Sequence, residues 1–252
     1  MRVEGETHGG IMQKKLIKSA GPLVAEALYK PRTVSAGRGR GRKSNPTNEL
    51  QKLVNERQSW QKLKWLLAAN FIKGDIVGCL TFDNEHLPET RKQVVNKFGW
   101  FKKKAEAARK ARGQELVMFW SIEHRHGDGR WHIHIVLNAT GGDDYAELHR
   151  LWGQGETEFS ALRVDARKNY ETLARYMCKE ARDKVGQRSW SYTRNAKKPE
   201  VESFWVDDST TLRVPKDATV FKDVRSRGEY QYIEFAYDNA LRRRRRSRKR
   251  RR

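Results

Sequence analysis

Two short apolar segments joined by a glycine-rich turn constrain the fold of this chain more than any other feature. Leu116–Ile122 and Trp131–Leu137 are rich in aromatic and β-branched residues, and Gly-Asp-Gly at 127–129 lies between them. This pattern predicts an antiparallel β-hairpin. His132 and His134 alternate with isoleucines along the second segment. Because side chains two residues apart point to the same face of a strand, the hairpin presents two imidazoles side by side.

Hydrophobic periodicity predicts further strands and helices on both sides of the hairpin. Helical spacing is found in 47–70, 87–113, 143–152 and 169–182, and apolar runs typical of strands are found in 76–82 and 159–164. The order is then strand, helix, strand, strand, helix, strand and helix. It predicts an α+β fold of the ferredoxin-like, split βαβ type, with the hairpin in a central antiparallel sheet and an added C-terminal helix that carries Tyr176.

The two ends of the chain differ in composition from this central part. Residues 1–46 have poor apolar periodicity and run into Arg-Gly repeats, which predicts a basic, flexible tail. The domain with the hairpin is expected to span 47–185. A small β-rich extension is expected at 186–240, where aromatic and β-branched residues are prominent, and an arginine-rich, solvated tail at 241–252.

The Arg-Gly repeats contain three candidate DNA-binding residues, Arg38, Arg40 and Arg42. Extended arginine arms of this kind bind in the minor groove of A·T-rich DNA. The alternative is a flexible basic linker. The repeats lack a Gly-Lys-Ser ending, so they are not a phosphate-binding P-loop.

The charge of the chain indicates a polyanionic partner. The 252 residues include 53 Lys and Arg against 31 Asp and Glu, which gives a formal net charge of +22. Basic proteins gain affinity for nucleic acids because they release counterions from the phosphates, so nucleic acid is the first candidate. Ribosomal proteins and proteins that bind anionic membranes share such a charge, so charge alone does not identify the activity.

Cysteine usage and hydropathy predict a soluble protein of a reducing compartment. Cys79 and Cys178 are the only cysteines, which excludes a disulfide framework and a Cys-x-x-Cys metal knuckle. The apolar stretch at 11–27 is interrupted by three lysines and a glutamate. It is too short and too polar for a membrane span or a signal sequence, so no membrane partner is expected.

A metal ion bound by the two histidines needs a third ligand, and Glu123 is the first candidate. A two-residue turn at 128–129 places Glu123 opposite His134, whereas a turn at 127–128 places it opposite His132. Glu123 lies on the histidine face in both registers. A three-residue turn would instead bring His124 or His126 to that face.

The predicted ligands favour one class of metal ion. Two imidazoles and a carboxylate suit Mn²⁺, which tolerates mixed nitrogen and oxygen ligands, and Mg²⁺ can bind through the carboxylate and water. The absence of cysteine ligands argues against a structural zinc site.

A tyrosine and a lysine lie three residues apart in the last predicted helix, at Tyr176 and Lys179. Residues at this spacing are neighbours on a helix surface. A phenol has a pKa near about 10, so it attacks phosphorus well only when a base or a cation stabilises its anion. Lys179 is the candidate cation.

Three segments resemble the ordered motifs of the HUH endonuclease superfamily. They are Gly-Cys-Leu-Thr-Phe at 78–82, His-Ile-His at 132–134 and Tyr-Met-Cys-Lys at 176–179. The histidine motif precedes the tyrosine motif, as in rolling-circle replication initiators and unlike conjugative relaxases. The downstream stretch at 188–200, which includes Arg194, is similar to replication proteins of small bacterial phages and plasmids. The resemblance spans about residues 74–200.

The resemblance implies an activity and a role for each matching residue. Tyr176 would attack a phosphodiester of single-stranded origin DNA and form a 5′-phosphotyrosine and a free 3′-hydroxyl. Lys179 would assist, while His132, His134 and Glu123 would bind the metal. Arg194 becomes a further expected DNA contact. The chain has no Walker A motif, so a host helicase and a polymerase in the bacterial cytoplasm are the expected partners.

Tyr170 departs from the pattern of initiators with two catalytic tyrosines. It lies six residues before Tyr176, on the apolar stripe of the helix, and we predict that it belongs to the core. Termination of replication would then call for another device, such as a dimer. Two other functions remain as alternatives, a single-tyrosine HUH transposase and a noncatalytic module that binds single-stranded nucleic acid.

Overall fold

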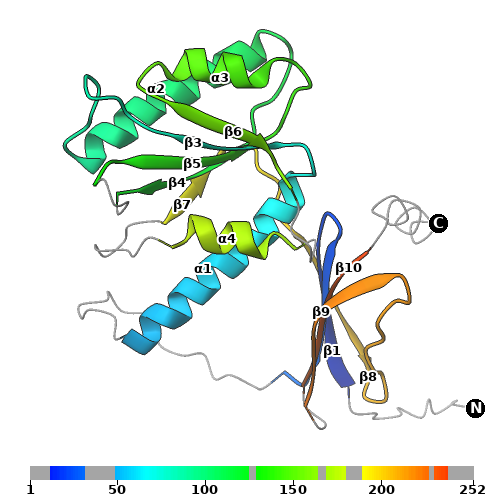
Figure 1. Ribbon diagram of the computed structural model, residues 1–252. Coiled ribbons are helices and arrows are strands. Elements are labelled where there is room, and N and C mark those ends of the chain that lie inside the picture. Colours follow the sequence, from blue (N-terminus) through cyan, green and yellow to red (C-terminus); the bar gives the residue numbers. More distant parts are fainter. Residues whose placement is uncertain are drawn as a thin grey trace, which may run out of the picture. The chain divides into compact units, whose positions relative to one another are not determined.

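The computed structural model describes residues 12–31, 49–124, 129–163, 169–179, 189–226 and 230–237 (Figure 1). These residues form an α+β structure with two antiparallel five-stranded sheets and four helices. The chain divides into two compact units, Asn45–Lys198 and a unit that combines Met1–Ser44 with Pro199–Arg252.

The larger unit contains the predicted order of elements. A strand, a helix, two strands, a helix and a strand follow one another, and two helices and a short strand are added to them. The elements are α1 (Glu49–Asn70), β3 (Ile76–Leu80), α2 (Arg91–Lys110), β4 (Met118–Glu123), β5 (His132–Leu137), α3 (Asp144–Trp152), β6 (Thr157–Ala161), α4 (Glu171–Met177) and β7 (Trp190–Tyr192). The sheet order is β6-β3-β5-β4-β7, so the hairpin strand β5 is central.

The sheet of the larger unit has one face for the core and one for polar residues. α2 and α3 cover the first face, and α1 and α4 lie on the other side (Figure 1). Ile133 and Ile135 of β5 are fully buried in the core under α2 and α3. Strand alternation therefore places His132 and His134 on the side of α4.

Gly78 keeps β6 close to β3. A Cβ atom at this position would collide with the ring of Phe159 and would lie 2.9 Å from the backbone oxygen of Glu158. The ring of Phe159 therefore occupies the space above the glycine. This contact explains why glycine precedes Cys79 in the middle of a strand, where it is otherwise unfavourable.

α2 is fixed at both ends. Thr90 caps its N-terminus in a capping box with Gln93. Near its C-terminus the buried Arg109 donates to Asp144 at the start of α3 at 3.3 Å and to Asn138 at 2.9 Å. These bonds join the two helices that cover the core face.

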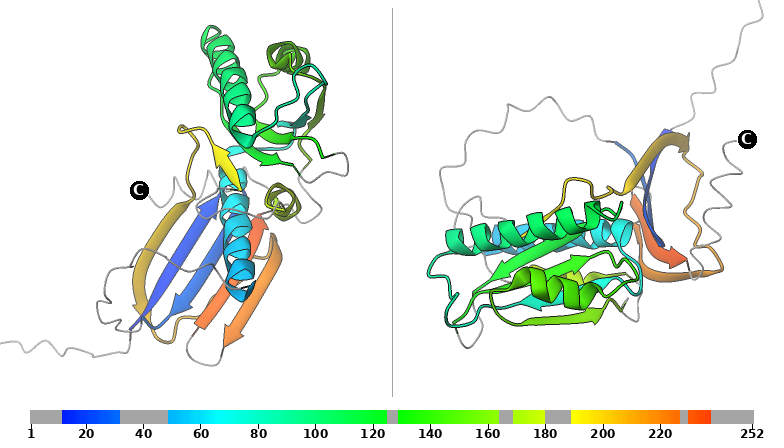
Figure 2. Two further views of the ribbon diagram at one scale, coloured as in Figure 1. Left: turned by 90° about the vertical axis from the view of Figure 1, so that its left-hand side faces the viewer. Right: turned by 90° about the horizontal axis from the view of Figure 1, so that it is seen from above.

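The smaller unit corrects the prediction that residues 1–46 form a tail. It is a sheet in the order β8-β1-β2-β10-β9, seen side by side in the left view of Figure 2. Its strands are β1 (Met12–Ala20), β2 (Leu23–Tyr29), β8 (Glu200–Asp207), β9 (Ala218–Ser226) and β10 (Tyr230–Tyr237). The lysines of β1 made the segment read as polar, and its partner β8 is far away in sequence.

The predicted boundaries at 185 and 240 also differ from the structure. β7 pairs with β4, so residues 190–192 complete the sheet of the larger unit, which ends at Lys198. The β-rich extension begins only at Pro199 and needs β1 and β2 to form its sheet. Its core consists of Val24, Leu28, Leu212, Ile233 and Phe235.

Several predictions fall on residues outside the described ranges. These are Arg38, Arg40 and Arg42, the tail at 241–252, His126 and the hairpin turn at 127–128. Among the helices of the described part, none has the length and apolar character needed to cross a membrane.

Candidate functional site

The hairpin register brings the predicted metal ligands together on one face. Glu123 of β4 pairs with His132 of β5. This is the register expected for a turn at 127–128, and the alternative that placed Glu123 opposite His134 is wrong. His134 instead lies opposite Ser121 of β4 and Cys79 of β3. Directly paired residues share a face, so all five side chains project toward the same side of the sheet.

A buried hydrogen bond joins Glu123 to His134. Nε2 of His134 donates to Oε2 of Glu123 at 2.7 Å, and both side chains are buried. Burial lowers the pKa of His134, although the hydrogen bond and the charge of Glu123 act in the opposite direction. The imidazole is therefore more readily neutral than an exposed histidine, as a metal ligand must be.

Lys179 contacts the other oxygen of the same carboxylate. Its Nζ lies 3.0 Å from Oε1 of Glu123. Burial raises the pKa of Glu123, but the hydrogen bonds from His134 and Lys179 outweigh burial, so the pKa is lowered overall. Glu123 is thus an ionised carboxylate with a partner on each oxygen.

Tyr176 lies over the histidine with its hydroxyl at the polar cluster. The hydroxyl is 3.4 Å from both ring nitrogens of His134, and the two rings meet edge to face with centroids 4.8 Å apart. Nζ of Lys179 lies 4.3 Å from the centre of the tyrosine ring. Tyr176 is nevertheless 43% exposed, so an external substrate can reach it.

Two opposing effects act on the phenol of Tyr176. Burial raises its pKa, and the nearby Cys79 and Glu123 act in the same direction. Lys179 lowers the pKa but does not reverse the shift. The phenol is therefore protonated at neutral pH in this state, and attack on phosphorus requires further activation.

Tyr170 belongs to the core, as predicted. It is buried, and its hydroxyl donates to the backbone oxygen of Phe71 at 2.6 Å. It precedes α4 and has a φ of 58°. α4 ends at Met177, so the predicted helix 169–182 is shorter in its described part, and Lys179 lies just beyond the helix.

The sequence analysis did not single out Cys79 as a site residue. Its Sγ is 3.8 Å from Nδ1 of His132. Burial, with the charges of Glu158 and Glu123, raises the pKa of this thiol to about 11. Strand parity could have assigned Cys79 to a face, but its register against β5 is a long-range property without a local signal.

The remaining predicted site residues lie apart from this cluster. His124, the alternative third ligand, is exposed, and its ring packs on Trp131 with centroids 4.0 Å apart. Arg194 is exposed in the turn after β7. Within the described ranges, no three His, Cys, Asp or Glu side chains are arranged so that they could hold a metal ion.

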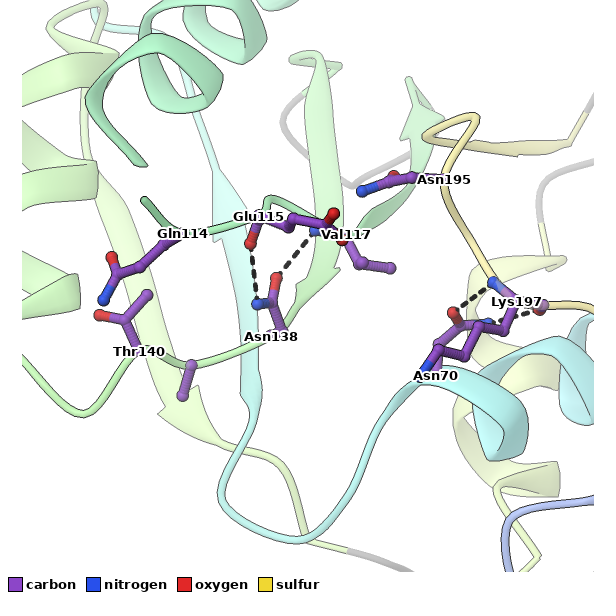
Figure 3. A pocket seen from close by; sticks show the side chains of 9 residues that line it. Asn70, Gln114, Glu115, Val117, Asn138, Thr140, Asn195 and Lys197 are labelled. Carbon is purple, nitrogen blue, oxygen red and sulfur yellow. Dashed lines mark hydrogen bonds between the residues drawn. The ribbon is translucent and has the colours of Figure 1, made fainter. Parts of the chain in front are cut away.

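A pocket of about 430 Å³ lies elsewhere in the larger unit (Figure 3). Amide side chains dominate its lining, but they are bonded to the protein itself. Asn138 bonds the backbone of Glu115 and Val117, and Asn70 bonds that of Lys197. None of the predicted metal-binding or catalytic residues lines this pocket.

A family model for the replication-associated protein ORF2 matches residues 75–181 of the chain. The matched segment includes β3, both hairpin strands and α4, and therefore every residue of the Glu123–His134–Tyr176–Lys179 cluster. No curated protein and no solved structure matches the chain. The match supports a family of replication initiators for this protein.

Proposed function

We propose that this protein is a rolling-circle replication initiator that nicks single-stranded DNA through Tyr176. The observation that carries the proposal is the position of the Tyr176 hydroxyl, 3.4 Å from the ring nitrogens of His134. His134 lies on the same strand face as His132, inside the segment that matches replication-associated proteins.

The arrangement of the larger sheet supports the HUH type of endonuclease. Its order β6-β3-β5-β4 is that of a split βαβ, ferredoxin-like sheet. The histidines lie on a central strand, and the tyrosine is supplied by a helix on the polar face of the sheet.

The proposed reaction is a phosphoryl transfer to the phenol. The Oη atom of Tyr176 forms a bond to phosphorus, and the bond from phosphorus to O3′ of the preceding nucleotide breaks. The phenol gives up its proton, and O3′ leaves with the electron pair and gains a proton. The products are a 5′-phosphotyrosine and a 3′-hydroxyl.

Lys179 is proposed to assist by stabilising the phenolate. Its ammonium group lies against the tyrosine ring and is held there by Glu123. A cation in this position lowers the free energy of the anionic nucleophile relative to the phenol. Lys179 can also neutralise part of the charge on the attacked phosphate.

His132, His134 and Glu123 are the residues that would hold a divalent ion, Mn²⁺ or Mg²⁺. The 2.7 Å between His134 Nε2 and Glu123 Oε2 is close to the roughly 3 Å expected between adjacent ligand atoms at about 2.1 Å from an octahedral ion. When bound, such an ion supplies a Lewis acid that polarises the scissile phosphate.

The proposed substrate and partners follow from the products. Single-stranded origin DNA is the substrate, and a polymerase would extend the 3′-hydroxyl. The sequence has no Walker A motif, so a host helicase would have to unwind the duplex. With Tyr170 buried in the core, a second subunit is one source of the second nucleophile needed for termination.

Adduct formation on labelled single-stranded DNA in the presence of Mn²⁺ tests this proposal. The full chain is expected to form a covalent adduct with origin DNA, Tyr176→Phe to form none, and Tyr170→Phe, if its melting shows it folded, to keep it. An adduct that survives in Tyr176→Phe, or no adduct with any origin DNA, contradicts the proposal. Joining of a transposon end to a target strand would instead indicate the transposase.

A further inference from the structure

The sheet of the smaller unit has two chemically different faces. One face carries the core residues Val24, Leu28, Ile233 and Phe235. Strand alternation and the cross-strand register place Trp205, Lys14, Tyr29 and Tyr230 on the other face. The nicking proposal does not use this second face.

An aromatic row crosses four strands of the second face. Trp205 of β8 pairs with Lys14 of β1, Lys14 pairs with Tyr29 of β2, and Tyr29 pairs with Tyr230 of β10. Trp205 is 56% exposed and Tyr230 is 42% exposed. We call these four residues the aromatic row. Large apolar rings at this exposure are costly on a surface unless they meet a partner.

Tyr232 extends the aromatic row and is held in place. Its ring is nearly parallel to that of Tyr230, with an interplanar angle of 8° and centroids 6.4 Å apart. Its hydroxyl donates to Glu234 at 2.8 Å, and Nζ of Lys222 lies 5.3 Å from the ring centre. These contacts fix two flat rings before any ligand binds, which reduces the entropy lost on binding.

Charges are segregated between the two faces. Among the paired strand residues, the aromatic face carries Lys14, Lys18 and Lys222, and its acidic residue Glu234 is buried. The opposite face carries more acidic than basic residues. They are Glu26, Glu200, Glu202 and Asp223 against Lys15 and Arg225. The aromatic face therefore attracts anions more strongly than the core face.

We propose that the aromatic face of the smaller sheet binds single-stranded DNA, with bases stacked on Trp205 and Tyr230 and phosphates near Lys14 and Lys222. Aromatic side chains interleaved with lysines are the combination that holds single strands without reading their sequence. Duplex DNA hides its base faces, so the exposed rings would find no stacking partner there. The inference goes beyond the nicking proposal, because it needs neither Tyr176 nor a metal ion.

Fluorescence anisotropy of the full chain with a labelled oligothymidine of about 20 nucleotides, long enough for a site of up to about 16 nucleotides, tests the proposal. Such DNA carries no origin sequence, so binding is measured without cleavage. Trp205→Ala and Tyr230→Ala are each expected to weaken binding roughly tenfold, the size of one lost stacking contact. Lys222→Gln is expected to reduce the dependence of the affinity on salt.

Phe204→Ala is the matched control. Phe204 precedes Trp205 on the same strand, is 41% exposed, and points to the opposite face. Its variant is expected to bind oligothymidine as the unchanged chain does, and thermal melting verifies the fold of all variants. Equal losses for Phe204→Ala and Trp205→Ala would overturn the proposal. So would unchanged DNA binding by Trp205→Ala with an altered oligomeric state, since the face would then bind protein. The proposal can fail while adduct formation by Tyr176 persists, and the reverse holds as well.

Discussion

Nζ of Lys179 lies 3.0 Å from Oε1 of Glu123. This ion pair holds the ammonium group against the ring of Tyr176, where it opposes the rise in the phenol pKa that burial causes. The chemistry of the tyrosine is therefore coupled to the carboxylate expected to bind the metal. A change in one residue of this pair should be measurable at the other.

Lys179→Gln is expected to slow adduct formation roughly tenfold to a hundredfold, because one stabilising charge near the nucleophile is lost. It should also move the pH dependence. Without Lys179 the pKa of Tyr176 rises further, so the rising limb of the rate is expected to shift to higher pH. Single-turnover rates measured across pH provide the test. Lys179→Arg should retain the position of the limb, and an unchanged limb in Lys179→Gln would refute the role of the ammonium group.

Asp144→Ala is expected to destabilise the protein by about 3–5 kcal/mol, because it leaves the charge of the buried Arg109 without its acidic partner. Urea unfolding followed by tryptophan fluorescence measures the change. Arg112→Ala removes an exposed ion pair with Glu147 and should cost less than about 1 kcal/mol. Similar losses in the two variants would contradict the structural role of the buried pair.

Gly78 and Gly99 should respond to alanine with opposite signs. Gly78→Ala drives a methyl group into Phe159 and should destabilise the protein by about 1–3 kcal/mol. At Gly99, in the middle of α2, a Cβ atom meets nothing within 4 Å. Gly99→Ala should therefore stabilise the protein by about 0.5–1 kcal/mol, since alanine favours helix. Thermal melting of both variants tests the prediction, and stabilisation by Gly78→Ala would rule out the packing described for β3 and β6.

The ion pair between Arg112 and Glu147 predicts an acid-dependent contribution to stability. The hydrogen bond from Arg112 lowers the pKa of Glu147 in the folded state. A lowered folded pKa means that the contribution is complete above the unfolded pKa, near about 4.3, and is lost as pH falls through the folded value. The melting temperature of the unchanged chain should thus fall more steeply than that of Glu147→Gln between about pH 5 and pH 3. Parallel curves would show that the pair does not contribute.

Local sequence patterns were sufficient for the hairpin and for the face of its histidines. The alternation around His132 and His134 and a two-residue turn placed Glu123 on the same face in either register, and the structure selects the pairing with His132. The periodicity of 169–182 also made Tyr170 a core residue, which its burial confirms. These features depend on neighbours that are close in the chain.

Long-range pairing limited the rest of the prediction. β1 lies between β2 and β8, and β8 follows it by about 180 residues, so no local pattern reveals that Lys14 and Lys18 belong to a strand. Cys79 reaches the histidine face through the pairing of β3 with β5, which is also nonlocal. The contact between Glu123 and Lys179 depends on the position of the chain after α4, which helical spacing alone did not give.

Peptide mapping by mass spectrometry tests the central claim most directly. The full chain is incubated with a single-stranded origin oligonucleotide and Mn²⁺, the DNA is digested to its last nucleotide, and the modified peptide is sequenced. The account predicts a nucleotide attached through its 5′-phosphate to Tyr176 alone. A nucleotide on Tyr170 or on any other residue, with Tyr176 unmodified, would contradict it.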